Sequence, residues 1–269
     1  MAMLRDITLG QYFPGNTIVH RLDPRTKLIL VTVYIVALFS AQDYISYAVM
    51  AVTLTVFVAL SRIKPSALLR GLRPLVMIIT LTAFINIFYS EGTVFAEFWI
   101  FKITYEGIKN SFFMTIRIIM LIMGTFLLTY TTSPLMLTDG LERIMNPLKK
   151  IKVPVHELSM MMSIALRFIP TLIEETDKIM SAQKARGADF ETGKLTERAK
   201  ALLPILVPLF VSAFRRADEL AVAMECRCYH GGEGRTKMKQ LVFIWQDFAA
   251  MAIGGLILAG VIVLAFFGL

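Results

Sequence analysis

The stretch VHELSMMMSIALRFIPTLIEETDKIMSAQKARG (residues 155–187) has a helical pattern but carries too many charges to lie wholly in lipid. One series of its apolar residues recurs every three or four positions, which places the series on one face of a helix. The series is Leu158, Met162, Ala165, Ile169 and Leu172. Gly187 can adopt the left-handed conformation that ends a helix, so we expect an amphipathic helix that ends at Ala185-Arg186-Gly187.

A second helical pattern runs from about residue 195 to residue 224 and ends on Glu225-Cys226-Arg227-Cys228-Tyr229. Its apolar run, residues 201–214, is shorter than the ~20 residues needed to cross a bilayer, so we expect it to lie against protein or at the membrane boundary. Pro204 and Pro208 stand one turn apart in this run. Each removes a backbone donor, which predicts a bend in the helix. Both helices therefore finish on an arginine.

The composition is typical of an all-α integral membrane protein. Of 269 residues, 56% are hydrophobic, which is too many for an ordinary soluble domain and enough for several membrane spans. The net charge of +8 matches the excess of Lys and Arg that cytoplasmic loops of membrane proteins carry. No nucleic-acid motif accompanies this charge, so we expect a lipid bilayer and no nucleic acid as partner.

The first 131 residues form the expected N-terminal membrane domain, with four spans. The basic flank 1–27 is expected to stay in the cytoplasm. Residues 28–61 contain no Lys or Arg, and as one helix they would measure about 50 Å, so we expect two short spans with an outside turn at Gln42-Asp43. A signal peptide is the alternative for the first run, but the long basic flank and the lack of a small-x-small cleavage site argue against it.

Two further spans complete this domain. A basic loop, residues 62–73, precedes the third span at about 74–89, and a slightly acidic outside loop, 90–110, precedes the fourth at about 111–131. The fourth span carries Arg117. Its guanidinium either reaches the membrane edge or serves as a functional charge within the membrane, and the sequence leaves both interpretations open.

The rest of the chain is expected to form a cytoplasmic coupling domain and a last span. Residues 132–245 hold 17 of the 28 Lys and Arg and no unbroken apolar stretch of spanning length, which places them inside. Residues 246–269 form the expected fifth, C-terminal transmembrane helix. Its Gly254, Gly255 and Gly260 permit close approach of a neighbouring helix.

The catalytic and metal-binding motifs that this sequence approaches are incomplete. The nearest candidate for a phosphate-binding loop, residues 231–237, has Thr236 where the motif requires its second glycine. Met160 stands where a zinc-protease motif that begins at His156 would need its second histidine. Cys226 and Cys228 lack partners at zinc spacing. We therefore expect a non-catalytic protein without cofactor or metal.

Several motifs together resemble one known family. Leu22-Asp23-Pro24-Arg25-Thr26-Lys27 precedes the first span, and Arg167-Phe168-Ile169-Pro170 lies in the first amphipathic helix. Two arginine signatures of the Ala-Arg-Gly type follow: Ala185-Arg186-Gly187, and Cys226-Arg227-Cys228, in which cysteines replace the alanine and the glycine. With these motifs the chain resembles the transmembrane T component (EcfT) of energy-coupling factor (ECF) transporters, the ABC-type vitamin importers.

The resemblance implies a location, a set of partners and a role for the motifs. It implies a multi-pass protein of the prokaryotic plasma membrane with its amino terminus in the cytoplasm. It also implies a complex with two ABC-type ATPase subunits and a membrane-embedded S component that captures a vitamin or other micronutrient. The two arginine signatures would dock in grooves on the ATPases, and the coupling helices would carry ATPase movement to the S component. The N-terminal motif supplies four further candidate site residues: Asp23, Pro24, Arg25 and Lys27.

Other interpretations of these features stay open. Arg186 and Arg227 could each complement a helix dipole, a contribution of about 0.3–1 kcal/mol when exposed, instead of offering a rigid fork of donors to a partner. The methionines of the coupling helices could be ordinary core or an adaptable surface: Met160, Met161, Met162, Met180 and Met224. The alternative function is a self-contained secondary transporter or channel regulated by its cytoplasmic helices, for which the spans offer only Asn86 and Arg117 as polar groups. A non-transport scaffold is third.

Overall fold

The computed structural model describes residues 12–89, 94–98, 101–190, 194–231 and 240–267. The chain divides into two compact units. The first, here called the membrane unit, consists of Gly10–Arg143 and Leu241–Leu269. The second, the coupling unit, includes Ile144–Gln240.

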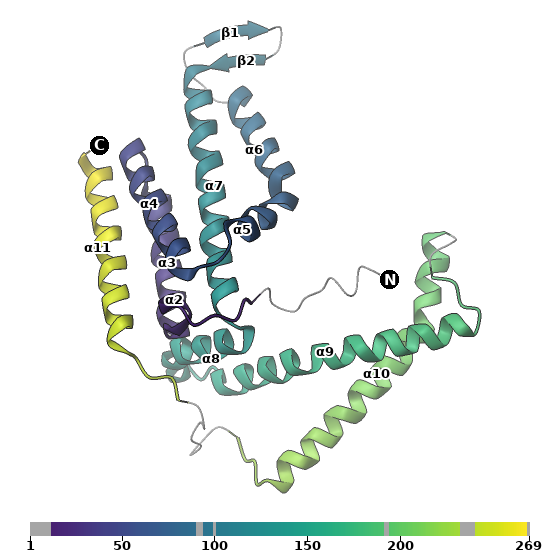
Figure 1. Ribbon diagram of the computed structural model, residues 1–269. Helices are drawn as coiled ribbons and strands as arrows, with labels where there is room; N and C mark the ends of the chain where they lie inside the picture. The colour runs from purple at the N-terminus through teal and green to yellow at the C-terminus, as the bar shows by residue number, and fades with distance from the viewer. Residues whose placement is uncertain (1–11, 90–93, 99–100, 191–193, 232–239, 268–269) are drawn as a thin grey trace. The chain divides into compact units, whose positions relative to one another are not determined.

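The membrane unit is built from helices (Figure 1). They are α2 (Ile18–Arg21), α3 (Pro24–Ser40), α4 (Tyr44–Ser61), α5 (Pro65–Leu72), η1 (Arg73–Leu75), α6 (Val76–Tyr89), α7 (Tyr105–Thr131), α8 (Pro134–Met145, whose last two residues belong to the coupling unit) and α11 (Trp245–Phe267). Within the described residues, four helical segments are long and apolar enough to cross a bilayer: Tyr44–Ser61, Pro65–Phe88, Tyr105–Thr131 and Trp245–Phe267. The apolar α3 has 17 residues and measures about 26 Å at 1.5 Å per residue. The expected all-α membrane class is confirmed.

The predicted break between the first two spans is also confirmed, and it explains Arg117. Helix α3 ends at Ser40 and α4 begins at Tyr44. The guanidinium Nη2 of Arg117, in the middle of α7, donates a hydrogen bond of 2.9 Å to the carbonyl of Ala41. Carbonyls at the end of a helix lack partners within that helix, so Arg117 satisfies one of them. It binds the end of a neighbouring helix, a role that neither sequence interpretation included.

Two segments expected as loops contain regular structure instead. The basic segment after α4 forms α5, whose Pro65 stands at a position where proline favours the start of a helix. Residues 90–110 contain an antiparallel hairpin of β1 (Val94–Phe98) and β2 (Phe101–Thr104), after which α7 already begins at Tyr105. The loop interpretation was wrong here because the hairpin sequence is rich in aromatic and β-branched residues that favour strands.

The core of the membrane unit lies where α3, α4, α7 and α11 meet. Its buried side chains include Leu38, Met50, Phe113, Met120 and Val261. Helix α11 packs along α3, and a Cβ atom added to Gly254 would lie 2.6 Å from Leu30 of α3. A Cβ added to Gly255 or Gly260 would meet no atom within 4 Å. Within the described residues of this chain, the predicted close helix approach is confirmed at Gly254.

The coupling unit contains η2 (Asn146–Ile151), α9 (Val155–Ala185) and α10 (Leu195–Cys226). Figure 1 shows α9 and α10 as two long helices. The predicted ends of both helices are confirmed to within a residue or two. Residues 134–151, which precede α9, are helical and form α8 and η2.

The two adjacent glycines of α11 provide a matched test of this packing. Gly254→Val should lower the melting temperature of the detergent-solubilised chain, because the branched side chain would overlap Leu30 at a cost of about 1–3 kcal/mol. Gly255→Val, which faces open space, should change it little. Equal destabilisation by both variants would contradict the packing of α11 on α3.

Candidate functional site

Arg186 lies at the carboxyl end of α9, in a hydrogen-bonded turn. The N–H of Gly187 donates to the carbonyl of Lys184 at 3.0 Å, and the N–H of Ala188 donates to the carbonyl of Gln183 at 3.0 Å. This pair of bonds is the Schellman motif, which satisfies the last carbonyls of a helix and requires a left-handed residue after the cap. Gly187 is that residue, with φ of 89°.

Arg227 lies in the same motif at the end of α10. The N–H of Cys228 donates to the carbonyl of Glu225 at 2.8 Å, and the N–H of Tyr229 donates to the carbonyl of Met224 at 3.0 Å. Cys228 takes the place of Gly187, with φ of 54°. A left-handed conformation is uncommon for a residue other than glycine. The two arginines thus occupy equivalent positions, although cysteine replaces glycine after the second.

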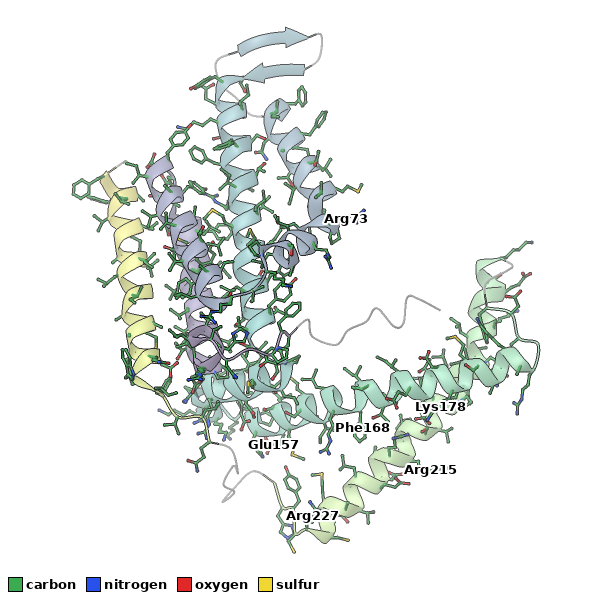
Figure 2. The ribbon with its side chains drawn as sticks, viewed as in Figure 1. Arg73, Glu157, Phe168, Lys178, Arg215 and Arg227 are labelled. Atoms are coloured by element: carbon green, nitrogen blue, oxygen red, sulfur yellow. The ribbon has the colours of Figure 1, made fainter. Side chains whose placement is uncertain are left out.

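Both arginines are available to a partner. Each is exposed, as are Cys226 and Cys228, which are free thiols. In the part of the chain that the structure describes, no ion pair joins either guanidinium to a carboxylate. Figure 2 shows Arg227 at the carboxyl end of α10 and Phe168 on the neighbouring helix α9. A positive charge at this position also complements the helix dipole, so the dipole contribution and partner binding are compatible.

A polar contact joins α9 to α10. The carboxylate of Glu175 accepts hydrogen bonds from the hydroxyl of Ser212 and from the guanidinium Nη2 of Arg216, the latter at 2.9 Å. The hydrogen bond from Ser212, together with the positive charge of Arg216, lowers the pKa of Glu175 below its usual value. The side chains of Glu175 and Arg216 are 22% and 36% exposed, so solvent screens the pair in part.

The two arginine ends lie at equal distances along the chain from this contact. Arg186 follows Glu175 by eleven residues (175 to 186), and Arg227 follows Arg216 by eleven residues (216 to 227). At 1.5 Å per residue each arm measures roughly 16 Å. The helices run antiparallel, since Met160 near the start of α9 lines the same groove as Met224 near the end of α10. The arginines therefore lie on opposite sides of the contact.

The face that α9 turns toward α10 is not the one that carries most of the apolar series identified from the sequence. The groove between them, about 470 Å³, is lined from α9 by Met160, Ile164, Phe168 and Leu172. Of the predicted series, Leu158, Met162 and Ala165 are exposed. The sequence carries two overlapping apolar series, and the one that contains Phe168 packs against α10.

The proline-containing run of α10 is mostly uncovered within this chain. Ile205 is buried, whereas neighbouring large side chains are about half exposed or more: Leu203, Val207, Phe210, Val211 and Phe214. Pro204 and Pro208 are exposed and lie inside a helix that continues through both of them. Pro170 likewise lies inside α9. The ribbon of α10 changes direction between its first turns and the long section that ends at Arg227 (Figure 1).

The N-terminal motif forms an internal clamp in the membrane unit. Asp23 caps α3 by accepting the N–H of Arg25 at 2.9 Å, and the same carboxylate accepts two bonds from the Arg25 guanidinium, at 3.1 and 2.9 Å. The guanidinium also donates to the carbonyl of Leu241 at 3.1 Å and lies 3.9 Å from the centre of the Phe243 ring. Pro24 begins the helix, and its Cβ leaves room only for glycine at position 140. Asp23, Pro24 and Arg25 thereby join the start of α3 to the segment before α11.

Asp247 and Lys27 complete the clamp. Asp247 is fully buried, and its carboxylate accepts the backbone N–H of Asp23 at 2.9 Å and that of Ile244 at 2.8 Å. The ammonium of Lys27 donates to the carbonyls of His20 and Thr131, which belong to the last turns of α2 and α7, and to the hydroxyl of Thr132. All four residues of the motif thus contribute to the fold of the membrane unit.

Asp247 and the Glu175–Arg216 pair were not among the residues predicted from the sequence. A signal for the first was present, because Asp247 is a lone carboxylate in the first turn of an otherwise apolar helix. The second had no signal, since charged residues on amphipathic helices normally face water. Both contacts join residues that are distant in the sequence.

Comparisons with known proteins agree on one family. The family model described as cobalt transport protein, CbiQ, matches residues 15–238. A protein of Thermosediminibacter oceani named energy-coupling factor transporter transmembrane protein EcfT is 55% identical over 98% of this chain and 99% of its own length. Proteins of the same name from Ruminiclostridium cellulolyticum and Bacillus subtilis are each 50% identical, over 98% and 91% of this chain and 99% and 93% of their own lengths.

Asp247→Asn tests the clamp. The amide keeps one acceptor but presents a donor where a buried N–H needs an acceptor, so the chain should lose about 1–3 kcal/mol of stability. The measurement is the melting temperature of the purified chain in detergent. Asp43→Asn is the control, because Asp43 precedes α4 without a side-chain capping bond. A melting temperature unchanged by Asp247→Asn would show that the clamp is dispensable.

The contact between α9 and α10 should depend on pH. The folded-state pKa of Glu175 is lowered, so its stabilising contribution is present above the ordinary carboxyl pKa and is lost as the pH falls through the lowered value. The stability difference between the parent and Glu175→Gln should therefore be present at pH 7 and shrink on acidification, in thermal unfolding followed across pH. Exposed Glu174→Gln should show no such difference at either pH. A difference that did not depend on pH would rule out a role for the Glu175 charge.

Proposed function

This chain belongs to the EcfT family of energy-coupling factor transporter transmembrane proteins, and we propose that it transmits movement of two ATPase subunits to a substrate-binding S component. As a member of that family it is a membrane component of an ECF transporter. Neither the substrate nor the ATPases are part of this chain.

The equivalence of the two arginine ends carries the proposal. Arg186 and Arg227 are exposed at the same position of the same capping motif, on opposite sides of the Glu175–Arg216 contact and at equal arm lengths. Two equal binding points on opposite sides of one contact suit two similar partners related by an approximate two-fold axis. We assign one ATPase subunit to each arginine.

The chemistry of arginine suits this role. Its planar guanidinium offers a rigid fork of donors to carboxylates and carbonyls, and it keeps its charge in a partner's groove. The residues that flank each arginine, Ala185 with Gly187 and Cys226 with Cys228, form the rest of the docking turn. Because each turn is fixed by two backbone hydrogen bonds, a displaced arginine would move its helix with it.

The uncovered apolar side chains are assigned to the S component. Exposed residues of α10 include Phe210 and Phe214, and α9 adds exposed Met161 and Met162. Flexible thioethers adapt to differently shaped partners, which suits contact with a separate membrane protein. The bend at Pro204 and Pro208 would set the direction of this apolar section relative to the arm that ends at Arg227. The vitamin is then chosen by the S component.

We further propose that the amino terminus and the coupling unit face the cytoplasm. Most Lys and Arg lie before the first span and between residues 132 and 245, and such residues remain inside. This orientation places both arginine ends on the side where ATP is available. It also leaves hydrolysis to the partners, because the sequence contains no phosphate-binding loop.

The decisive variants are Arg186→Ala, Arg227→Ala and their combination. Each loss should weaken ATPase binding by roughly 2–5 kcal/mol if the docked pair is well desolvated. Effects on assembly should be close to additive because the two sites are far apart, whereas vitamin uptake should fall steeply with either loss. Arg→Lys should rescue only in part, since lysine lacks the fork. The measurements are co-purification of the ATPases and vitamin uptake, with membrane insertion checked separately.

Arg215→Ala is the matched control. Arg215 is exposed on the same helix but lies away from both capping turns (Figure 2). This variant should assemble and transport like the parent. The proposal would be contradicted if the double variant lacking Arg186 and Arg227 still held both ATPases and transported normally. The helix dipole would then be the better explanation of both arginines.

A further inference from the structure

A large cavity lies in the membrane unit between the N-terminal segment and the junction of α4 and α5. It measures about 1160 Å³ and is lined by residues 13–18 and 20 on one side and by residues from the end of α4 through Arg70 on the other. Helix α4 is an apolar candidate span that ends at Ser61, directly before Arg62. The cavity therefore lies at the end of a candidate membrane span, where the chain becomes basic.

The charged groups of the cavity are all cations. Arg62, Lys64 and Arg70 line it and are exposed, and no Asp or Glu is among its described lining residues. Within the described ranges these three make no ion pair or hydrogen bond through their side chains. The hydroxyl of Ser66 adds a neutral donor in the first turn of α5. Such a concave cluster of unpaired cations attracts an anion.

The cavity has an apolar neighbour on the same helices. A pocket of about 70 Å³ is lined by Val19 of α2, Leu54 and Phe57 of α4, and mostly apolar residues of α3 and α7. Lys27, whose ammonium is bound to backbone carbonyls, also lines it. On α4 this pocket lies about one turn from Ala59 and Leu60, which line the basic cavity. On α2, Val19 stands between Ile18 and His20, both of which line the basic cavity. Residues of the same two helices thus line both a polar, cationic space and a mostly apolar slot.

We propose that this cavity binds the headgroup of an anionic phospholipid, with part of an acyl chain in the adjoining apolar pocket. The phosphate is held by Arg62, Lys64 and Arg70. Arginine supplies paired donors to phosphate oxygens, and lysine supplies a point charge. A free phosphate ester would satisfy the cations but would leave the apolar pocket without an occupant, so a lipid is the better match to both spaces.

The experiment uses the full chain, purified and stripped of lipid in detergent, and native mass spectrometry. The three probes are dioleoylphosphatidylglycerol, dioleoylphosphatidylcholine and soluble glycerol 1-phosphate. Phosphatidylglycerol should bind more tightly than phosphatidylcholine, because the latter's headgroup carries no net charge. Glycerol 1-phosphate should bind at least about tenfold more weakly than phosphatidylglycerol, because it lacks the chains that would bury apolar surface.

A charge-matched pair of triple variants separates the cavity from general attraction to a basic protein. Arg62→Gln, Lys64→Gln and Arg70→Gln together should weaken phosphatidylglycerol binding on the order of 100-fold, at about fivefold for each cation. The control combines Arg73→Gln, Lys149→Gln and Lys150→Gln, which remove equal charge from exposed positions outside the cavity. It should change the affinity less than about twofold.

Three results would overturn the proposal. Equal loss of phosphatidylglycerol binding in both triple variants would show that the lipid is held only by non-specific attraction to a basic protein. Equal affinity for phosphatidylcholine would show that the cations do not recognise the headgroup. Equal affinity for glycerol 1-phosphate would identify a free phosphate ester as the ligand. The comparison of the three probes on the parent chain decides the matter even if a triple variant folded poorly.

Discussion

Backbone groups at helix ends need hydrogen-bond partners. This chain supplies them in different ways in its two units. In the membrane unit, buried charged side chains do so, both within their own helix ends and across long separations in the sequence. Asp23 and Asp247 accept N–H groups around the starts of α3 and α11, and Lys27 donates to the carbonyl ends of α2 and α7. The sequence motif around Asp23 is therefore a structural clamp that holds segments together. In the coupling unit, backbone turns do the same work at Gly187 and Cys228 and leave the adjacent arginines exposed.

The two exposed arginines and the contact between α9 and α10 indicate how the chain would transmit movement. Two long helices meet at the Glu175–Arg216 contact, and each carries an arginine about 16 Å beyond it along the helix axis. Movement of a partner bound at one arginine would turn that helix about the contact and shift the other helix as well. A partly exposed ion pair and a hydroxyl contribute little stability, which suits a contact about which two helices must move.

Much of this was predictable because the signals are local. A glycine after an arginine predicts a helix end from neighbouring residues alone, and the membrane class follows from composition. The face of α9 was not predictable. Its sequence carries two apolar series, and only packing against α10 makes the one containing Phe168 the inner face. The lone carboxylate of Asp247 was a local signal, but its pairing with Asp23 was not predictable, because the two residues are 224 positions apart in the sequence. The left-handed Cys228 shows a capping turn persisting where its usual glycine is absent.

The central claim is that the ends of α9 and α10 bind two separate ATPase subunits. It can be tested most directly with a photo-crosslinking residue placed at Ala185 or at Cys226, which are exposed and directly precede the two arginines. The exposed mid-helix position Asp218 serves as the control. In the assembled transporter each end position should capture one ATPase subunit, a chain carrying both should capture two, and Asp218 should capture none. Capture of a single subunit by the doubly substituted chain, or of no ATPase from either end, would contradict the account.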